Sequence, residues 1–456
     1  MSGAKDAAPD PQGNQSAARP GLATRRAAQR LLAAVIETRT SLDGLTDDEH
    51  GHPQFMALEP RDRALARAIL ASALRHRVTI DRLLSGLFDR PLPKNASNLL
   101  HILHVAAAQI LFLDVPDRSA VDLAVESAKS DPRSARFASL VNAVLRKLIR
   151  SKEAALPDML AKTDDAPDWF VERLRHAYGQ EKASAILAMH RIPAPLDLTV
   201  KEDAAGSAMK LNGQVLPNGT VRLESFEGKV SDLPGFAEGK WWVQDVAASL
   251  PARLLGDIEG KRVADLCAAP GGKTASLVLQ GAKVTAVDMS ASRLKRLQSN
   301  LSRLGLSAET RIANLLDFKP AELLDAVLLD APCSSTGTIR RHPDVAWTKT
   351  PEDIEKLAAL QLKLLKHCIT MVRPGGVILF SNCSLDRFEG EDLTARFLAE
   401  EKNVGSFGFL PGELPGFAHL IDQNGWLRTT PADLDLGRPG VSGMDGFFAA
   451  RFKRLN

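Results

Sequence analysis

Four short apolar runs in the second half of the chain, each followed by a turn and a helical stretch, constrain the fold more than any other feature of the sequence. The runs are Val263–Leu266, Val284–Val287, Ala326–Leu329 and Val377–Phe380. Strands that alternate with helices in this way predict a parallel sheet with helices on both faces, and such a sheet binds its ligand at the carboxyl ends of the strands. Two closing strands, at Trp426–Thr429 and Gly446–Phe452, are expected to be antiparallel.

The first third of the chain has a different pattern. From about Arg25 to Arg150 apolar residues recur at helical spacing, and clusters of Pro and Asp separate the segments. This pattern predicts an all-α unit of five or six short helices. The net charge is only +3, but residues 1–150 hold 21 Lys and Arg against 16 Asp and Glu. An excess rich in Arg suits contacts to phosphate groups, although a solvated helix surface explains the same charges.

Between these two parts the pattern is mixed. We expect a helix at Trp169–Met189, strands at Leu196–Val200 and Thr220–Leu223, and a helix at Asp203–Leu211. A length of 456 residues agrees with two or three structural units. The predicted division is a flexible tail over 1–22, a helical domain over 23–150, a linker and small α/β adaptor over 151–235, and a larger α/β domain over 236–456.

Composition and cysteine content exclude several classes of protein. No run approaches the roughly 18 apolar residues of a membrane span. Four cysteines in so long a chain do not make a disulfide framework, and none forms a CxxC pair, so we expect no bound metal. The N-terminal segment contains Asp6 and Asp10 and lacks the apolar core of a signal peptide. We therefore expect a cytoplasmic protein that does not associate with a membrane.

A turn rich in small residues follows the first apolar run. It consists of Cys267, Ala268, Ala269, Pro270, Gly271, Gly272 and Lys273. Its glycines let the backbone approach a ligand at the start of the next helix, where backbone amides are free. Asp288 ends the second run, and an acidic residue at this position suits the hydroxyls of a ribose. An ordinary strand–helix turn and a helix cap would explain these features separately, but together they favour an adenosine-containing cofactor.

Two cysteines follow the last two apolar runs. Cys333 lies in the segment LLDAPCSSTG, and Cys383 lies in LFSNCS. A single cysteine at a strand end is more often a packed apolar residue than a nucleophile. Two cysteines on neighbouring strands that face one crevice are harder to explain as packed residues, and they indicate a catalytic role. Cys368, in the helix between them, is expected in the core, and Cys267 is expected to contact the cofactor through its backbone only.

These segments resemble those of a known enzyme family. AAPGGKT, DAPCSSTG, and NCSL with a following EGE are similar to motifs of the NOL1/NOP2/Sun family of RNA cytosine-5 methyltransferases, as are VQDVAAS and GMDGFF. The first third, with AQILFL and VNAVLR, resembles a NusB-like RNA-binding domain. The resemblance implies a Rossmann-like class I methyltransferase domain, preceded by a small α/β adaptor and an all-α NusB-like domain. It also implies S-adenosyl-L-methionine as the cofactor, bound by the glycine turn, Asp288, Asn314 and Asp330.

What the resemblance implies about catalysis agrees with the chemistry of cytosine. C5 of cytosine is a weak nucleophile until a thiolate adds to C6, after which it can attack the methyl group of the cofactor. By the family pattern Cys383 is this nucleophile and Cys333 assists release of the methylated product, while Asp330 contacts the cytosine edge or borders the cofactor. The chain departs from the pattern at Asn314, where a carboxylate is usual, and at Asn382, where threonine is usual. A free thiol has a pKa near ~8.5, so Cys383 needs activation by its surroundings.

We therefore expect an RNA cytosine-C5 methyltransferase whose substrate is 16S ribosomal RNA. A transfer RNA methyltransferase on the same scaffold is the main alternative with this chemistry. A DNA cytosine methyltransferase would have its nucleophile at Cys333, and the second cysteine and the NusB-like part argue against it. An inactive RNA-binding assembly factor is the alternative from another class, and the intact Cys383, Cys333 and Asp330 argue against it. The fused NusB-like domain removes one need for a partner chain, so we expect a monomer.

Overall fold

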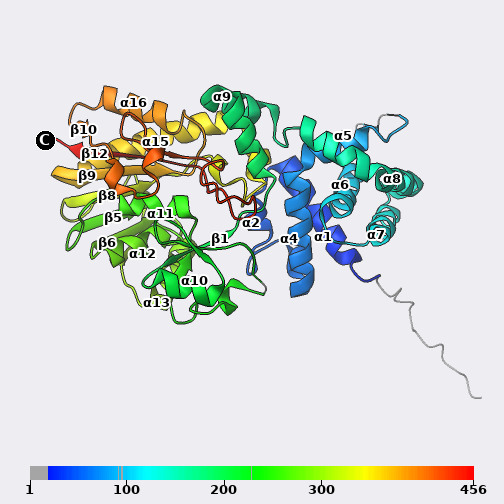
Figure 1. Cartoon of the computed structure of the whole chain (residues 1–456), viewed down its shortest axis with the longest axis horizontal. Coiled ribbons are helices and arrows are strands. Elements are labelled where there is room, and N and C mark those ends of the chain that lie inside the picture. Colours follow the sequence, from blue (N-terminus) through cyan, green and yellow to red (C-terminus); the bar gives the residue numbers. More distant parts are fainter. Residues whose placement is uncertain (1–18, 91, 94–95, 227) are drawn as a thin grey trace, which may run out of the picture. The chain divides into compact units, whose positions relative to one another are not determined.

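The computed structural model describes residues 19–90, 92–93, 96–226 and 228–456 (Figure 1). The predicted flexible tail over 1–22 lies outside the described residues as far as residue 18. The chain forms two compact units, Met1–Lys162 and Thr163–Asn456. In the described part, the first unit is helical and the second contains both sheets.

The first unit has the all-α structure that the sequence predicts. Its α-helices in the described part are α1 (Leu22–Thr38), α2 (Leu42–Leu45), α3 (Pro53–Met56), α4 (Pro60–Arg75), α5 (Arg77–Ser85), α6 (Ser97–Phe112), α7 (Asp117–Lys129) and α8 (Ala138–Lys162). Their apolar faces form a core in which Leu31 of α1, Ile69 of α4, Leu103 of α6 and Leu145 of α8 are fully buried. The last helix continues to Lys162, past the predicted end of the helical domain at residue 150.

The second unit begins with α9 (Asp168–His190), which agrees with the predicted helix but is interrupted at Gly179, where φ is 76°. A small antiparallel sheet with the order β2-β3-β1-β4 follows, together with α10 (Ala204–Leu211). Its strands are β1 (Leu196–Val200), β2 (Gln214–Val215), β3 (Val221–Leu223) and β4 (Trp241–Val243). Because β4 lies beyond residue 235, where the predicted adaptor ends, this sheet takes one strand from the segment that follows it.

An ion pair is buried in the small sheet. Nε and Nη2 of Arg222 on β3 each donate to a carboxylate oxygen of Asp197 on β1 at 2.7 Å, and neither side chain is exposed. Nη1 of the same arginine donates to the carbonyl oxygens of Val441 and Gly443. A buried ion pair needs full hydrogen bonding of both partners to be tolerated. This pair therefore ties the small sheet to the segment that precedes the last strand.

The larger sheet has the order β10-β12-β9-β8-β5-β6-β7, and β11 pairs with β12. Its strands are β5 (Arg262–Leu266), β6 (Lys283–Asp288), β7 (Glu309–Ile312), β8 (Leu324–Asp330), β9 (Val372–Asn382), β10 (Val404–Ser406), β11 (Leu427–Thr429) and β12 (Phe447–Arg454). The neighbouring strands β7, β6, β5, β8 and β9 are parallel to one another. In contrast, β12 is antiparallel to β9, β10 and β11. The predicted Rossmann-like fold and its antiparallel closing strands are confirmed. The apolar pattern did not predict β7, because three of its four residues are exposed.

Helices cover both faces of the larger sheet (Figure 1). One face packs against α15 (Pro351–Met371) and α16 (Glu391–Glu400). The other packs against α11 (Val246–Arg253), α12 (Gly272–Leu279) and α13 (Ala291–Arg303). Because both faces of the central strands are buried, these strands have continuous apolar runs without alternating polar residues.

The strand order reverses at β5. The chain passes from β5 through β6 to β7 on one side, and then crosses over to β8 and β9 on the other side. The carboxyl ends of β5 and β8 therefore flank a crevice, which is the position where open α/β sheets bind ligands.

Candidate active site

A cavity of about 450 Å³ lies at the carboxyl ends of β5 and β8. The residues predicted to bind the cofactor that line it are Cys267, Ala268, Ala269, Pro270, Gly271, Gly272, Lys273 and Asp330. Trp242 and Gln244, at the end of β4, and Asn300 of α13 also line it. The glycine turn and the small sheet thus enclose one space, whose volume lies in the range of cofactor sites.

The conformation and close contacts of the glycine turn leave little room for side chains at its two glycines. At Gly271 φ is 102°, and a Cβ atom there would lie 2.8 Å from Cγ of Leu297. A Cβ atom at Gly272 would lie 3.3 Å from Nε2 of Gln244. Among the described residues no side chain caps α12, which begins at Gly272. The first amides of this helix therefore remain available to a ligand, as the sequence predicts.

Asp265 lines the same cavity, although it was not predicted as a site residue. Its side chain is fully buried, and Oδ2 accepts a hydrogen bond of 2.6 Å from the hydroxyl of Thr274. Oδ1 has no hydrogen-bond partner among the described residues. Burial, together with the charge of Asp330, raises the pKa of this carboxyl from 3.8 to about 7. An acidic residue inside an apolar strand is the signal that identifies it in the sequence.

Asp288 and Asn314, also predicted to bind the cofactor, are absent from the lining of this cavity. The buried carboxylate of Asp288 accepts from the backbone N–H groups of Ala269 at 3.3 Å and Ser290 at 3.0 Å, and it forms an ion pair with Arg293 at 3.1 Å. Asp288 therefore braces the glycine turn. Asn314 is exposed after β7, and its side-chain oxygen accepts from the backbone two residues further on.

Lys273 and Asp330 form an ion pair at the edge of the cavity. Nζ of Lys273 lies 2.8 Å from Oδ2 of Asp330, and Ser381 donates to Oδ1 of the same carboxylate at 3.0 Å. The ammonium group also lies 4.9 Å from the centre of the Phe447 ring. Burial lowers the pKa of Lys273, but the charge of Asp330 and the hydrogen bond raise it overall. The lysine is therefore a fixed positive charge at this position.

The structure brings the two predicted catalytic cysteines together. Sγ of Cys333 lies 3.5 Å from Sγ of Cys383, and both residues are partly exposed. The hydrogen bond between the thiols, together with burial, raises the pKa of Cys333 well above its ordinary value. The same bond lowers the pKa of Cys383, against the effects of burial and of Asp330, and Ser335 and Lys273 lower it further. Cys383 is therefore the thiol of the pair that ionises first.

Burial is the largest cause of the raised pKa values of the other two cysteines. It raises the pKa of Cys368 to about 12, and this side chain is fully buried in α15, in the core position that the sequence predicts. It also raises the pKa of Cys267 strongly, and the charge of Asp330 adds to this effect. Neither thiol is available as a thiolate near neutral pH.

The backbone around Cys383 is held at three successive carbonyl groups. The N–H of Gly337 donates to the carbonyl of Cys383 at 2.9 Å. Arg428 donates to the carbonyl of Ser384 at 2.5 Å, and the hydroxyl of Tyr178 donates to that of Leu385 at 2.7 Å. The segment after β9 is therefore held in one conformation by residues from distant parts of the unit.

A half-buried arginine between two buried carboxylates forms another wall of the cavity. Nη2 of Arg341 lies 2.6 Å from Oδ2 of Asp245, and Nε lies 3.2 Å from Oδ1 of Asp445. All three line the cavity. Asp245 and Asp445 lie in segments that resemble family motifs and Arg341 does not, and no role was predicted for any of the three, because only the tertiary structure brings them together.

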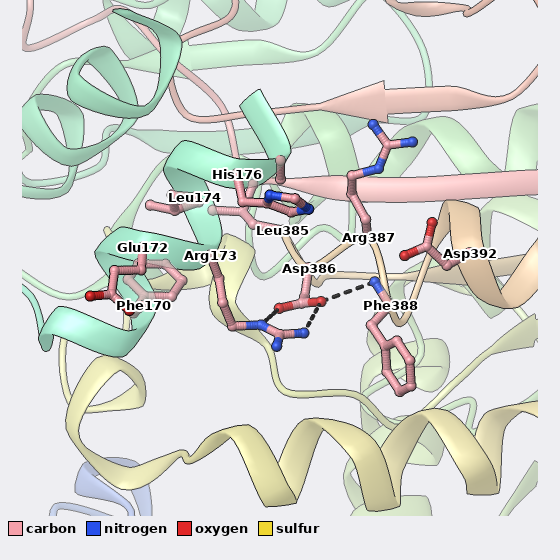
Figure 2. A pocket seen from close by; sticks show the side chains of 11 residues that line it. Phe170, Glu172, Arg173, Leu174, His176, Leu385, Asp386, Arg387, Phe388 and Asp392 are labelled. Atoms are coloured by element: carbon pink, nitrogen blue, oxygen red, sulfur yellow. Dashed lines mark hydrogen bonds and ion pairs between the residues drawn. The ribbon is translucent and has the colours of Figure 1, made fainter. Parts of the chain in front are cut away.

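A second cavity, of about 620 Å³, lies beside the segment that follows Cys383. It is bounded by α9 and by residues from Leu385 to Phe388 and on to Asp392, and it includes none of the predicted site residues (Figure 2). Arg173 of α9 donates to both oxygens of Asp386, at 2.5 and 2.8 Å. This ion pair fixes the far end of the Cys383 segment to α9.

The described residues contain no group of three or more His, Cys, Asp or Glu side chains that could hold a metal ion. None of the described helices is long and apolar enough to cross a membrane.

The fold and the cavity at its strand crossover place this chain among the S-adenosyl-L-methionine-dependent methyltransferases. A family model described as 16S rRNA methyltransferase RsmB/F matches residues 252–453, and the NusB family model matches residues 22–150. The ribosomal RNA small subunit methyltransferase B of Xanthomonas campestris is 37% identical over 398 residues, which cover 83% of this chain and 88% of that protein. The corresponding protein of Xylella fastidiosa is 35% identical over 447 residues, covering 94% and 98%.

A solved structure is also similar to this chain. The crystal structure of a methyltransferase homologue from Pyrococcus horikoshii is 25% identical, with a TM-score of 0.51 over 68% of this chain and 98% of that chain. The chain belongs to the RsmB/F family of 16S rRNA methyltransferases and carries an N-terminal NusB-family domain. The predicted family, fold, enzyme class and cofactor are thereby confirmed.

Proposed function

We propose that this protein transfers a methyl group from S-adenosyl-L-methionine to C5 of a cytosine in 16S ribosomal RNA, through a covalent adduct between Cys383 and C6 of the base. The observation that carries the proposal is the 3.5 Å contact between the thiols of Cys383 and Cys333, with Cys383 the more acidic of the two. The names of the relatives support ribosomal RNA as the substrate.

The residues of the cavity fit the cofactor. The unpartnered Oδ1 of Asp265 is an acceptor suited to an ammonium group, such as that of the methionine part. Small residues from Cys267 to Gly272 and the uncapped start of α12 allow close approach of the backbone. We assign cofactor binding to this turn, with Asp330 at the cavity edge and Asp288 and Asn314 acting from beside it. The bound cofactor supplies an electrophilic methyl group.

The chain's own groups account for the reaction on the base. The Cys383 thiolate adds to C6, which makes C5 nucleophilic towards the methyl group. The C5 proton then passes to solvent water, the C5–C6 double bond re-forms, and Cys383 leaves C6 as the thiolate, which releases the product. Cys333, which keeps its proton because of its raised pKa, assists this release. We assign contact with the polar edge of the cytosine to the ion-paired Lys273 and Asp330; the base must be unpaired or flipped out to enter the site.

The 3.5 Å contact with the Cys333 thiol and the charge of Lys273 support the proposal that these two groups activate Cys383. Acidification of Cys383 argues against the arrangement of a DNA cytosine methyltransferase, in which Cys333 would be the nucleophile. An inactive assembly factor is not favoured, because the thiol pair and the cofactor cavity are both formed. The relatives reported above are ribosomal RNA enzymes, so a transfer RNA substrate is not favoured either.

The test is a denaturing gel of Cys333→Ser incubated with S-adenosyl-L-methionine and unmodified small-subunit RNA. Cys383→Ser and wild type are run beside it, and Cys368→Ser is the matched control. We expect a slowly migrating, RNase-sensitive adduct only with Cys333→Ser. An adduct or activity retained in Cys383→Ser would reverse the roles of the cysteines. Absence of product with wild type, on free RNA and on small-subunit particles, would contradict ribosomal RNA as the substrate.

Further assignments belong to the same proposal. We assign RNA binding to the helical domain predicted over 23–150; the division into a tail, this domain, an adaptor over 151–235 and a methyltransferase domain over 236–456 stays a prediction, although α8 continues to Lys162 and the small sheet includes β4. The NusB family model, which matches residues 22–150, supports the predicted end of the helical domain at residue 150. The monomeric state and the cytoplasmic location remain predictions from the sequence, testable by light scattering and by cell fractionation.

A further inference from the structure

One buried carboxylate joins the segments that carry the two cysteines. Glu389 is fully buried, and each of its two carboxylate oxygens accepts two hydrogen bonds. Oε1 accepts from the backbone N–H of Ser334 at 2.9 Å and from Nε2 of Gln361 at 2.8 Å. Oε2 accepts from the hydroxyl of Ser334 at 2.5 Å and from the hydroxyl of Ser384 at 2.6 Å. The four donors come from three separate parts of the unit.

The bonded serines directly follow the two cysteines in the sequence: Ser334 follows Cys333, and Ser384 follows Cys383. The residues that precede the two cysteines are hydrogen-bonded to Glu389 or to its partner Gln361. Gln361, which donates to Glu389, also donates to the carbonyl of Pro332 at 3.0 Å. Asn382 donates to the backbone carbonyl of Glu389 at 2.8 Å. Each cysteine is therefore anchored on both sides to one buried network.

The hydrogen bonding of Glu389 is complete for an ionised carboxylate. Two oxygens offer about four acceptor sites, and four donors occupy them. Burial raises the pKa of this carboxyl, while the bonds from Ser334 and Ser384 act against that rise. A buried charge is expensive, and an apolar side chain of similar size is often as stable or more so. The carboxylate is thus better explained by the geometry it imposes than by stability.

We propose that Glu389 is a positioning residue for methyl transfer, which acts through Ser334 and Ser384 to hold the Cys333 and Cys383 segments at the separation seen between the two thiols. This inference rests on the proposed function of the thiols. Because the thiols are on separate segments, loosening either segment changes their contact. A displacement of about 1 Å in an active site can reduce the rate about a hundredfold.

The conservative variant Glu389→Gln separates hydrogen bonding from charge. Ser334 N–H and Gln361 Nε2 can only donate, and the amide oxygen of glutamine can accept both bonds. Its NH2 group would take the place of Oε2 and face two hydroxyls, which can rotate to accept. Glu389→Gln therefore preserves the network, whereas Glu389→Ala removes it. Arg451→Met is the control for lost stability, since Arg451 is buried in β12 with an ion pair to Glu413 and has no bond to this network.

We expect Glu389→Ala to lower kcat about a hundredfold with little change in KM for RNA or cofactor, and Glu389→Gln to keep kcat within about tenfold of wild type. The second readout needs no methylation. Limited labelling with N-ethylmaleimide, mapped by mass spectrometry, should modify Cys383 before Cys333 in wild type and Glu389→Gln. Glu389→Ala should lose this preference, and Arg451→Met should retain both kcat and the preference.

Several outcomes would overturn the proposal. Unchanged kcat and labelling in Glu389→Ala, or equal losses in Arg451→Met at matched melting temperature, would reduce Glu389 to a stabilising residue. A Glu389→Gln variant as inactive as Glu389→Ala would show that the charge matters and not the geometry. Should Glu389→Ala fail to fold, Ser384→Ala removes one of the four bonds and should weaken the labelling preference. If wild type methylates no RNA, the proposed function fails, while the labelling still decides whether Glu389 sets the thiol geometry.

Discussion

Replacing Cys333 with alanine removes the hydrogen bond that contributes most to the lowered pKa of the Cys383 thiol. Hydrogen bonds to a charged acceptor contribute roughly 1.5–3 kcal/mol, and the weak S–H donor and 3.5 Å separation indicate the lower end. Removal of the bond should therefore raise the pKa of Cys383, and since about 1.4 kcal/mol corresponds to a factor of ten in an equilibrium constant, the thiolate fraction below the midpoint should fall about tenfold. Asp330 and Lys273, the charged groups that act on Cys383, remain in place.

The sign of the effect follows from the thiolate, which is present above the pKa and is lost as the pH falls through it. An upward shift therefore moves the alkylation profile to higher pH, and at a pH below the midpoint the rate should fall about tenfold. The assay is iodoacetamide alkylation of Cys383, followed by mass spectrometry from about pH 6 to about pH 10. Cys368→Ala is the matched control, because its thiol is buried in α15, and its Cys383 profile should equal that of wild type. An unchanged or lower midpoint in Cys333→Ala would refute the reasoning.

Three further predictions concern stability. Gly337→Ala should destabilise the protein by about 1–3 kcal/mol in urea denaturation and lower kcat. The added Cβ would lie 2.0 Å from the carbonyl oxygen of Gly446. Burial raises the pKa of Asp265 from 3.8 to about 7, so wild-type stability should fall as the pH rises through this interval. Asp265→Asn should remove that dependence, as measured by urea denaturation at both ends of it. Arg222→Met should cost about 3–5 kcal/mol in the same assay, because it leaves Asp197 buried without its ion-pair partner.

Each of these has a control. Gly412→Ala adds a Cβ with no atom within 4 Å, and it should change stability by less than about 0.5 kcal/mol. A loss equal to that of Gly337→Ala would contradict the steric argument. The double variant Asp197→Leu with Arg222→Met should recover much of the loss, since it leaves no unpaired charge. A difference between Asp265→Asn and wild type that does not vary with pH would contradict the burial argument.

Strands and turns that depend on neighbouring residues were predictable from the sequence. The strand Leu196–Val200 has the predicted bounds, and the four apolar runs lie inside β5, β6, β8 and β9. These strands are buried on both faces, which makes the apolar run continuous and visible. β7 was missed because it is an exposed edge strand, and its polar residues carry no such signal. The small sheet extends past residue 235 because β4 pairs with β1, a long-range contact that local sequence does not encode.

The candidate site was predictable only in part. The glycine turn and Asp330 line the cavity, because motifs at the ends of parallel strands meet at one edge of the sheet. The contact of Asp288 with the cofactor stays a prediction; in the structure its carboxylate accepts from the glycine turn and pairs with Arg293. Asp265 and Glu389 were not predicted as site residues, since their significance comes from burial and from partners far along the chain.

By itself the sequence determined the strand–helix alternation, the glycine turn and the presence of Cys333 and Cys383 after the last two apolar runs. These features depend on residue size, apolar periodicity and backbone freedom within a few neighbours. Only the tertiary structure decided that the Cys333 and Cys383 thiols lie 3.5 Å apart and that Cys383 is the one acidified. The physical reason is that pKa values and bond distances depend on which groups share a buried space, and folding brings those groups together from distant segments.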